Sequence, residues 1–191
     1  MKYKVFFLTF LLLTIISCSN KYHLNEKELK MLNSEIDMMY VNDQSARLYF
    51  DKIDSIFGID KRNNLEMYKS NNQRSFLGEE KYQVYKFKND SLWKVINRID
   101  EYNTNKLIEI TEKYGFPSNQ RLKVNMSKAY FLFVHSSSKY FDKINVLIEN
   151  EFKEGRISEY CKEYIFWHTK KGRKGMPPMS GKNGEAIYNN F

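Results

Sequence analysis

A long apolar stripe at helical spacing is the feature that most constrains how this chain of 191 residues can fold. After Asp90, apolar side chains recur every three or four residues, which is the repeat of an α-helix that buries one face. The stripe consists of Leu92, Val95, Ile96, Ile99, Leu107, Ile110 and Tyr114, interrupted by Asn103. Gly115 and Pro117 follow it, and both residue types commonly end helices. We therefore expect a helix that begins at Asp90 and ends before Gly115.

The same reasoning predicts helices on both sides of this stripe. Asn25 can cap a helix, with Glu28 completing a capping box, and Asp43 can cap a second helix that Gly58 ends. Their expected buried faces are Leu29, Leu32, Ile36 and Met39, and then Ala46, Phe50, Ile53 and Phe57. Three further helices are expected to open at Ser127, Ser138 and Ser158. The prediction is a mainly α protein with a single compact domain of about six helices.

Two segments lack a clear helical pattern. Residues 59–89 are rich in Asn and have no clean period, so we expect a loop there, with a possible short strand over 81–88. Residues 172–184 contain four glycines and two prolines, which predicts an irregular C-terminal tail. The helical domain is therefore expected to cover 26–169, and the tail 170–191.

The N-terminus has the form of an export signal. Lys2 and Lys4 precede twelve uncharged residues, which is too short for a membrane span of about twenty residues but suits a signal peptide. The run ends in Ile15-Ile16-Ser17-Cys18, which resembles the lipobox of bacterial lipoproteins. That resemblance implies a signal peptide over 1–17, acylation of Cys18 with lipids such as palmitate, and a tether over 18–25. The expected location is the bacterial cell envelope, at the outer membrane if the cell is Gram-negative.

Charge and cysteine content narrow the options further. The chain has 31 Lys and Arg against 23 Asp and Glu, and removal of Lys2 and Lys4 lowers the net charge from +8 to +6. This modest excess does not indicate a specific nucleic-acid partner. Once Cys18 is lipidated, Cys161 remains, so no internal disulfide is expected. The cations of the tail, Lys170, Lys171, Arg173 and Lys174, could contact anionic lipid or another polyanion, or could simply be solvated.

Several short stretches together resemble an uncharacterised bacterial family of unknown function that is often found in lipoproteins. They are NDQSAR at 42–47, DEYNTNKLIEITEKYGFPS at 100–118 and AYFLFVHSS at 129–137. The residues that carry the resemblance are Asp43, Gln44, Arg47, Asn103, Thr104, Leu107, Gly115, Phe116, Pro117 and His135. The C-terminus departs from the family, which usually has an Asp-Arg pair and a Tyr-Gly-Thr-Gln stretch. The resemblance implies a mostly helical fold and no particular reaction.

The strongest candidate site is a polar cluster of five residues. Asp43 and Arg47 are four residues apart and can pair on one helix face, beside Gln44. Asn103 and His135 interrupt apolar stripes, and buried polar side chains need partners. The cluster could serve structure or catalysis.

A weaker candidate combines Cys161 with His168, seven residues away, and His135 in a thiolate–imidazole pair or a three-ligand metal site. The alternative is that Cys161 is simply buried. The chain has no Cys-x-x-Cys or His-x-x-x-His spacing, so neither a metal nor a cofactor is predicted.

Three functions are compatible with this sequence. The first is a non-enzymatic binding or accessory module that is anchored in the cell envelope. The second is a hydrolase-like enzyme that uses the Asp43, Arg47 and His135 cluster. The third is an immunity or inhibitor protein for a partner toxin, whose identity the sequence does not indicate.

Overall fold

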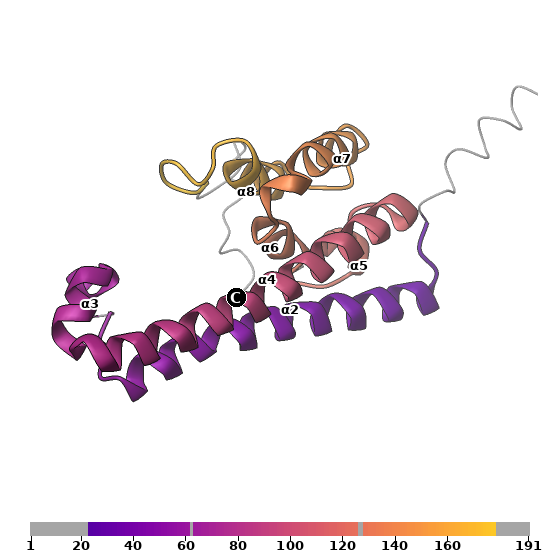
Figure 1. Cartoon of the computed structure of the whole chain (residues 1–191). Coiled ribbons are helices and arrows are strands. Elements are labelled where there is room, and N and C mark those ends of the chain that lie inside the picture. The colour runs from indigo at the N-terminus through magenta and orange to yellow at the C-terminus, as the bar shows by residue number, and fades with distance from the viewer. Residues whose placement is uncertain (1–22, 62, 126–127, 179–191) are drawn as a thin grey trace, which may run out of the picture.

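The computed structural model describes residues 23–61, 63–125 and 128–178, and this part of the chain consists mainly of helices joined by short connections (Figure 1). Within it there are seven α-helices and two short 3₁₀ turns, and no strand. The elements are α2 (Glu26–Ile56), η1 (Leu65–Tyr68), α3 (Ser70–Leu77), α4 (Glu79–Tyr114), α5 (Asn119–Leu122), α6 (Ala129–Val134), η2 (Ser138–Tyr140), α7 (Phe141–Lys153) and α8 (Glu159–Thr169). The mainly α class expected from the sequence is confirmed.

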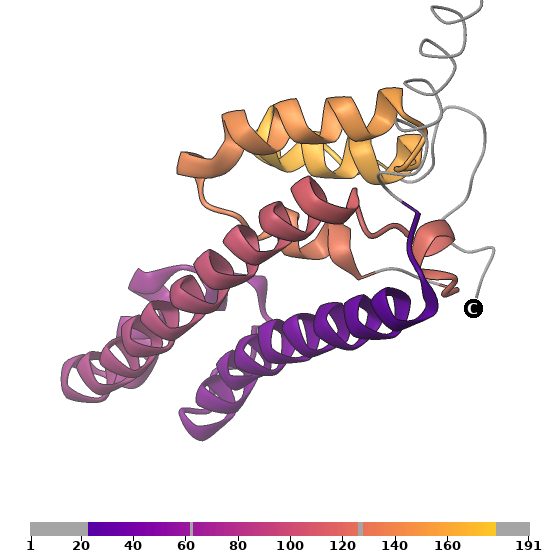
Figure 2. The ribbon, with the colours of Figure 1, turned by 90° about the vertical axis from the view of Figure 1, so that its right-hand side faces the viewer.

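Two long antiparallel helices form the frame of the molecule. α2 and α4 lie side by side, and at one end they extend together as an arm that carries α3 (Figure 1). At 31 and 36 residues, the two helices are about 46 and 54 Å long at 1.5 Å per residue. At the other end, α6 packs on both of them, and α7 and α8 cover α6 and the end of α4 (Figure 2).

The main core lies at this covered end. It buries Leu32, Ile36 and Met39 of α2 against Leu107 and Ile110 of α4. The other helices contribute Leu132, Phe133, Ile144, Ile148, Ile165 and Phe166. Asn25 and Glu28 form the expected capping box, and Ser158 caps α8 through the backbone amide of Cys161. Local capping and the apolar stripe of the first half of α2 therefore place this core as predicted, whereas Phe50, Ile53 and Phe57, also expected to face inward, are only half-buried.

The first correction concerns Asp43, which does not cap a second helix. α2 continues without a break from Glu26 to Ile56, so Asp43 lies near its middle. No Gly or Pro interrupts this stretch, and the apolar face continues through Ala46. The Asp43 side chain instead contacts Gln44 and Arg47 of the same helix and His135 at the end of α6.

The second correction concerns residues 59–89, which are mostly helical. α3 begins at Ser70 and α4 begins at Glu79, so residues 81–88 are helical and Asp90 lies inside a helix. The reason is a second, smaller core at the far end of the arm, where Tyr82 and Tyr85 pack on Ile59. These tyrosines are three residues apart, which is a helical spacing. Val95, expected to be buried, is 49% exposed, whereas the adjacent Ile96 is 1% exposed, so Val95 lies on the solvent side of α4.

The connection after α4 is held by a buried carboxylate. Gly115, with φ of +76°, ends α4 in a conformation that favours glycine. The backbone amide of the next residue, Phe116, donates to Glu151 Oε2 of α7 at 2.7 Å. Glu151 also accepts from Arg156 Nε at 2.7 Å and Nη2 at 2.8 Å. The Gly-aromatic-Pro-Ser stretch therefore fixes the end of α4 against α7.

The later elements differ slightly from the expected boundaries. Ser127 lies outside the described residues, and the buried helix α6 has six residues, from Ala129 to Val134. Ser138 begins η2, which runs directly into α7. Residues 1–17 and Cys18 also lie outside the described part of the chain. Among the described residues, no helix has both the length and the apolar character needed to cross a membrane.

Candidate functional site

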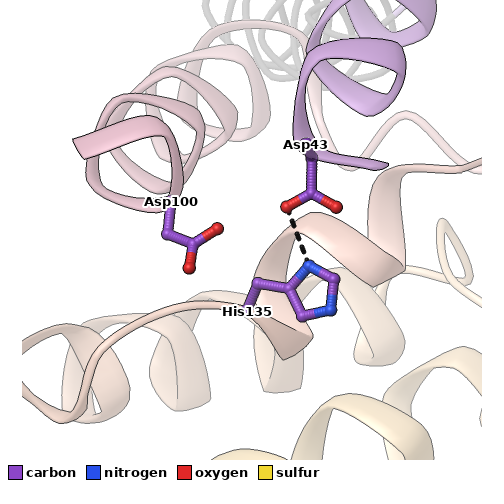
Figure 3. Close-up of side chains that lie close together, drawn as sticks. All are labelled: Asp43, Asp100 and His135. Carbon is purple, nitrogen blue, oxygen red and sulfur yellow. Dashed lines mark hydrogen bonds and ion pairs between the residues drawn. The ribbon is translucent and has the colours of Figure 1, made fainter. Parts of the chain in front are cut away.

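Three helices converge on a cluster of charged side chains at the base of the arm. Asp43 comes from the middle of α2, Asp100 from α4 and His135 from the C-terminal end of α6 (Figure 3). The Asp43 side chain is only 1% exposed, whereas those of Asp100 and His135 are 13% and 17% exposed. The cluster is therefore buried on the α2 side and reaches solvent through His135 and Asp100.

Asp43 is the hub of this cluster. Its Oδ1 lies 2.9 Å from His135 Nδ1 and accepts from Arg47 Nη2 at 3.1 Å. Its Oδ2 accepts from Gln44 Nε2 at 2.6 Å. The structure thus brings together four of the five predicted residues, and it satisfies the buried carboxylate with three donor side chains, as a buried charge requires.

Asp100 completes the cluster and was not anticipated from the sequence. Its Oδ1 lies 2.5 Å from Arg47 Nη2, so the guanidinium of Arg47 bridges the two carboxylates. Asp100 lies three residues before Asn103, one helical turn away, and this spacing was the signal available in the sequence.

Asn103 is buried as predicted, at 2% exposure. Its Nδ2 donates to the backbone oxygen of Met39 at 3.3 Å, one turn before Asp43. It therefore joins α4 to the backbone of α2 beside the cluster, and its amide is directed to the main chain.

The two carboxylates differ in acidity although they share Arg47. Burial raises the pKa of Asp43, but the hydrogen bonds and charges of His135 and Arg47 outweigh burial and lower the pKa to about 2. Burial dominates at Asp100 and, with the repulsion of Asp43 and against the attraction of Arg47 and His135, raises its pKa to about 6. Asp43 therefore releases its proton readily because His135 and Arg47 both stabilise its charge, whereas burial makes Asp100 hold its proton to higher pH.

The end of α6, which carries His135, is braced by the C-terminal segment. His168 Nε2 lies 2.8 Å from the backbone oxygen of Ser136, and its Nδ1 accepts from Arg173 Nε at 3.0 Å. Arg173 Nη2 donates to the backbone oxygen of Val134. The carbonyls on both sides of His135 are therefore held by one ring and one guanidinium, and burial lowers the pKa of His168.

This arrangement corrects the expectation for the tail. Lys170, Lys171 and Lys174 are exposed, as the sequence suggested. Arg173 is also exposed as a residue, but its guanidinium folds back on α6, where burial together with the positive charge of Arg47 lowers its pKa. Trp167 Nε1 donates to the backbone oxygen of Gly175 at 3.2 Å, which holds the segment against α8.

The predicted combination of Cys161, His168 and His135 does not form a ligand set. Within the described ranges, the group of three metal-ligating side chains that come together is Asp43, Asp100 and His135, whose ligand atoms all lie within 4.8 Å of one another. Cys161 is half-buried on α8, and His168 binds the backbone of Ser136 and the side chain of Arg173.

A second buried carboxylate lies at the end of the arm. Asp54 pairs with Lys61 at 2.9 Å and accepts from the Tyr85 hydroxyl at 2.7 Å. The ammonium of Lys61 also lies over the rings of Tyr68 and Tyr85. The charge of Asp54 is thus neutralised by Lys61, and the Lys61 ammonium also links η1 to α4 through Tyr68 and Tyr85.

The chemical capacity of the main cluster follows from its carboxylate–imidazole contact. A carboxylate that binds Nδ1–H fixes the orientation of the ring and leaves Nε2 as an acceptor for a proton or a ligand. No family model matches the chain, and comparison with curated proteins and with solved structures gave no match either. The family resemblance therefore stays a prediction, and conclusions about function depend on the site itself.

Proposed function

We propose that this chain is a lipid-anchored module of the bacterial cell envelope that acts by binding rather than by catalysis. Its helical domain, centred on the cluster of Asp43, Arg47, Asp100 and His135, would be held at the membrane through Cys18. The observation that supports a binding role is the buried position of Asp43, whose carboxylate oxygens already accept hydrogen bonds from three side chains. Such a saturated carboxylate joins α2 to α6 and leaves Arg47, His135 and Asp100 as the partly exposed members of the cluster.

The anchor is tested by fractionation of cells that carry the wild-type chain or Cys18→Ala. Acyl chains supply most of the membrane affinity of a lipoprotein, and firm anchoring needs two or more of them. We expect the wild type in the membrane fraction and the Ala variant in the soluble fraction, with equal melting temperatures for both. Sedimentation of both forms with membranes would contradict the proposal. Ser19→Ala is a matched control that leaves the thiol in place.

The basic segment supplies a second contact with the membrane in this proposal. Lys170, Lys171 and Lys174 are exposed and adjacent, and each would add about 1 kcal/mol of attraction to an anionic surface. Changing these three lysines to Gln should abolish binding of the Cys18→Ala protein to phosphatidylserine vesicles at low salt. Arg173 should not be included, because it braces α6. Binding that persists in 1 M salt would show that it is not electrostatic.

A hydrolase-like enzyme is the second candidate function. It is favoured by the contact between buried Asp43 and His135, because an orienting carboxylate and a partly exposed imidazole are the parts of a general base. A panel of ester, phosphoester and peptide model substrates tests it. Turnover that the wild type shows and His135→Gln loses would favour the enzyme, whereas equal background rates in both proteins would favour the binding module.

A further inference from the structure

The cluster brings three potential metal ligands from three separate helices into one small volume. Asp43, Asp100 and His135 each offer one ligand atom, and all of these atoms lie within 4.8 Å of one another. Two ligands of a single ion, each about 2.1 Å from the metal, are about 3–3.5 Å apart. The 2.9 Å between Asp43 Oδ1 and His135 Nδ1 is close to that separation, and the proton that these two atoms share without an ion would leave when a metal binds. The backbone thus already places these two groups as neighbouring ligands would be placed.

The Arg47 guanidinium marks where a cation is stabilised. Its Nη2 contacts Asp43 Oδ1 at 3.1 Å and Asp100 Oδ1 at 2.5 Å, so a positive group lies between the two carboxylates. The Arg47 side chain is 23% exposed, which makes it the most exposed of the four charged members of the cluster. It can therefore turn outward without passing through the core, and the two carboxylates would then face each other without a counter-charge.

The hydrogen bonds around the ligands suit a metal as well. Gln44 donates to Asp43 Oδ2, which orients the carboxylate so that Oδ1 faces His135 and Arg47. The backbone on both sides of His135 is fixed by His168 and Arg173. Partners of this kind hold ligand side chains in place in metal sites. A mixed set of one imidazole and two carboxylates favours Zn²⁺ or a similar transition metal over Mg²⁺ or Ca²⁺.

We propose that Asp43, Asp100 and His135 form a site for one divalent transition-metal ion such as Zn²⁺, and that Arg47 competes with the ion for the space between the carboxylates. Three protein ligands leave one position of a tetrahedral ion open for water or a ligand. Binding of a metal would therefore replace a guanidinium that closes the cluster with an ion that can accept a further ligand. This inference goes beyond the proposed anchored module, and its test does not depend on the anchor.

The test is calorimetric titration of Zn²⁺ into the full chain, purified in detergent without a polyhistidine tag. We expect one ion per chain for the wild type. His135→Ala and Asp100→Asn should each weaken binding by on the order of 100-fold, because each removes a ligand, and even the partners of metal ligands matter by 10–100-fold. Arg47→Gln should strengthen binding by about tenfold or more, since it removes the competing cation. Mg²⁺ should bind far more weakly than Zn²⁺.

Matched controls separate this site from adventitious binding. His23→Ala removes an exposed histidine, and Asp90→Asn removes an exposed carboxylate on the same helix as Asp100, so both should bind Zn²⁺ as the wild type does. Circular dichroism of each variant verifies that it is folded. Cys18→Ala should also bind normally, so that failure of the anchor and failure of the metal site are distinguishable.

Two results would overturn the proposal. The first is equal affinity in the wild type and His135→Ala, because the ion would then be held elsewhere. The second is absence of saturable binding in the wild type. Binding by Arg47→Gln alone would then show that Arg47 permanently occupies the space, and binding by neither protein would show that the three side chains do not form a metal site.

Discussion

Replacement of Asp43 by Asn should destabilise the protein more than any exposed charge on the same helix. Asn keeps the shape of the side chain but removes a charge that is 1% exposed and accepts from His135, Arg47 and Gln44. The pKa of Asp43 is lowered from 3.8 to about 2, and a difference of this size corresponds to about 2.5 kcal/mol. Breaking a buried ion pair typically costs about 3–5 kcal/mol. Because Arg47 keeps its contact with Asp100, we expect the lower end, about 3 kcal/mol.

Thermal unfolding followed by circular dichroism measures this cost. For a domain of this size, about 3 kcal/mol lowers the melting temperature by about 6–12 °C at pH 7. The matched control is Asp37→Asn, also on α2, where the carboxylate is 63% exposed and pairs with Lys128. A surface pair of this kind contributes at most about 1 kcal/mol, so the control should shift the melting temperature by only a few degrees.

The pH dependence of the same variant gives an independent test. A carboxyl whose pKa is lower in the folded protein contributes its full stabilisation above the unfolded pKa of 3.8, and loses it as pH falls through about 2. The difference between wild type and Asp43→Asn should therefore be constant from pH 7 to about 4 and shrink between about 4 and 2. A difference no larger than that of Asp37→Asn, or one that is unchanged at pH 2, would refute the account of Asp43 as a buried, ionised hub.

Three further outcomes follow from other buried polar groups. The wild type should lose up to about 3 kcal/mol of stability as pH rises from about 4 to 6, because the raised pKa of Asp100 makes the folded state hold its proton longer. Asp100→Asn should abolish this loss. Urea unfolding at several pH values measures it, and an unchanged dependence of the unfolding free energy on pH would contradict it. Asn103→Leu should cost about 1 kcal/mol and lower the melting temperature by about 2–4 °C, since one bond of 3.3 Å to Met39 is lost, and an unaltered melting temperature would mean that this bond contributes nothing. Glu151→Gln should cost about 3 kcal/mol in urea unfolding, because Arg156 and the Phe116 amide lose a charged acceptor. The control Glu154→Gln, which changes a carboxylate that is 64% exposed, should cost less than about 1 kcal/mol. Equal costs would show that burial of Glu151 is unimportant.

Local signals in the sequence were enough to predict the class of the fold. The capping box at Asn25, the cap at Ser158 and the glycine at 115 act within one or two helical turns, so each could be read without knowledge of the tertiary structure. The continuous α2 and the early start of α4 could not be read in this way. Asp is common at helix starts, and only the packing of α2 against α6 shows that Asp43 serves as a tertiary partner instead.

The candidate site could likewise be predicted in part, from local signals in the sequence. Asn103 and His135 stood out because each breaks an apolar stripe, and both are held by contacts to α2. Asp100 was marked only by its spacing of one helical turn from Asn103, and Arg173 lies in a run of cations with no local pattern to distinguish it. Their roles depend on how α4 and the C-terminal segment are rotated about their axes, and that rotation is set by the packing of the whole core.

The two separate cores give the molecule an uneven resistance to local opening. The main core joins most of the helices, whereas the core at the end of the arm depends on three buried residues, Ile59, Tyr82 and Tyr85, and a few partly buried neighbours. Local unfolding begins where few apolar contacts must be broken. Backbone amides around Tyr82 should therefore exchange their hydrogens with solvent much sooner than those around Leu107, although both belong to α4. One uninterrupted helix thus spans two cooperative units, and the far end of the arm can fray while the charged cluster at its base stays closed.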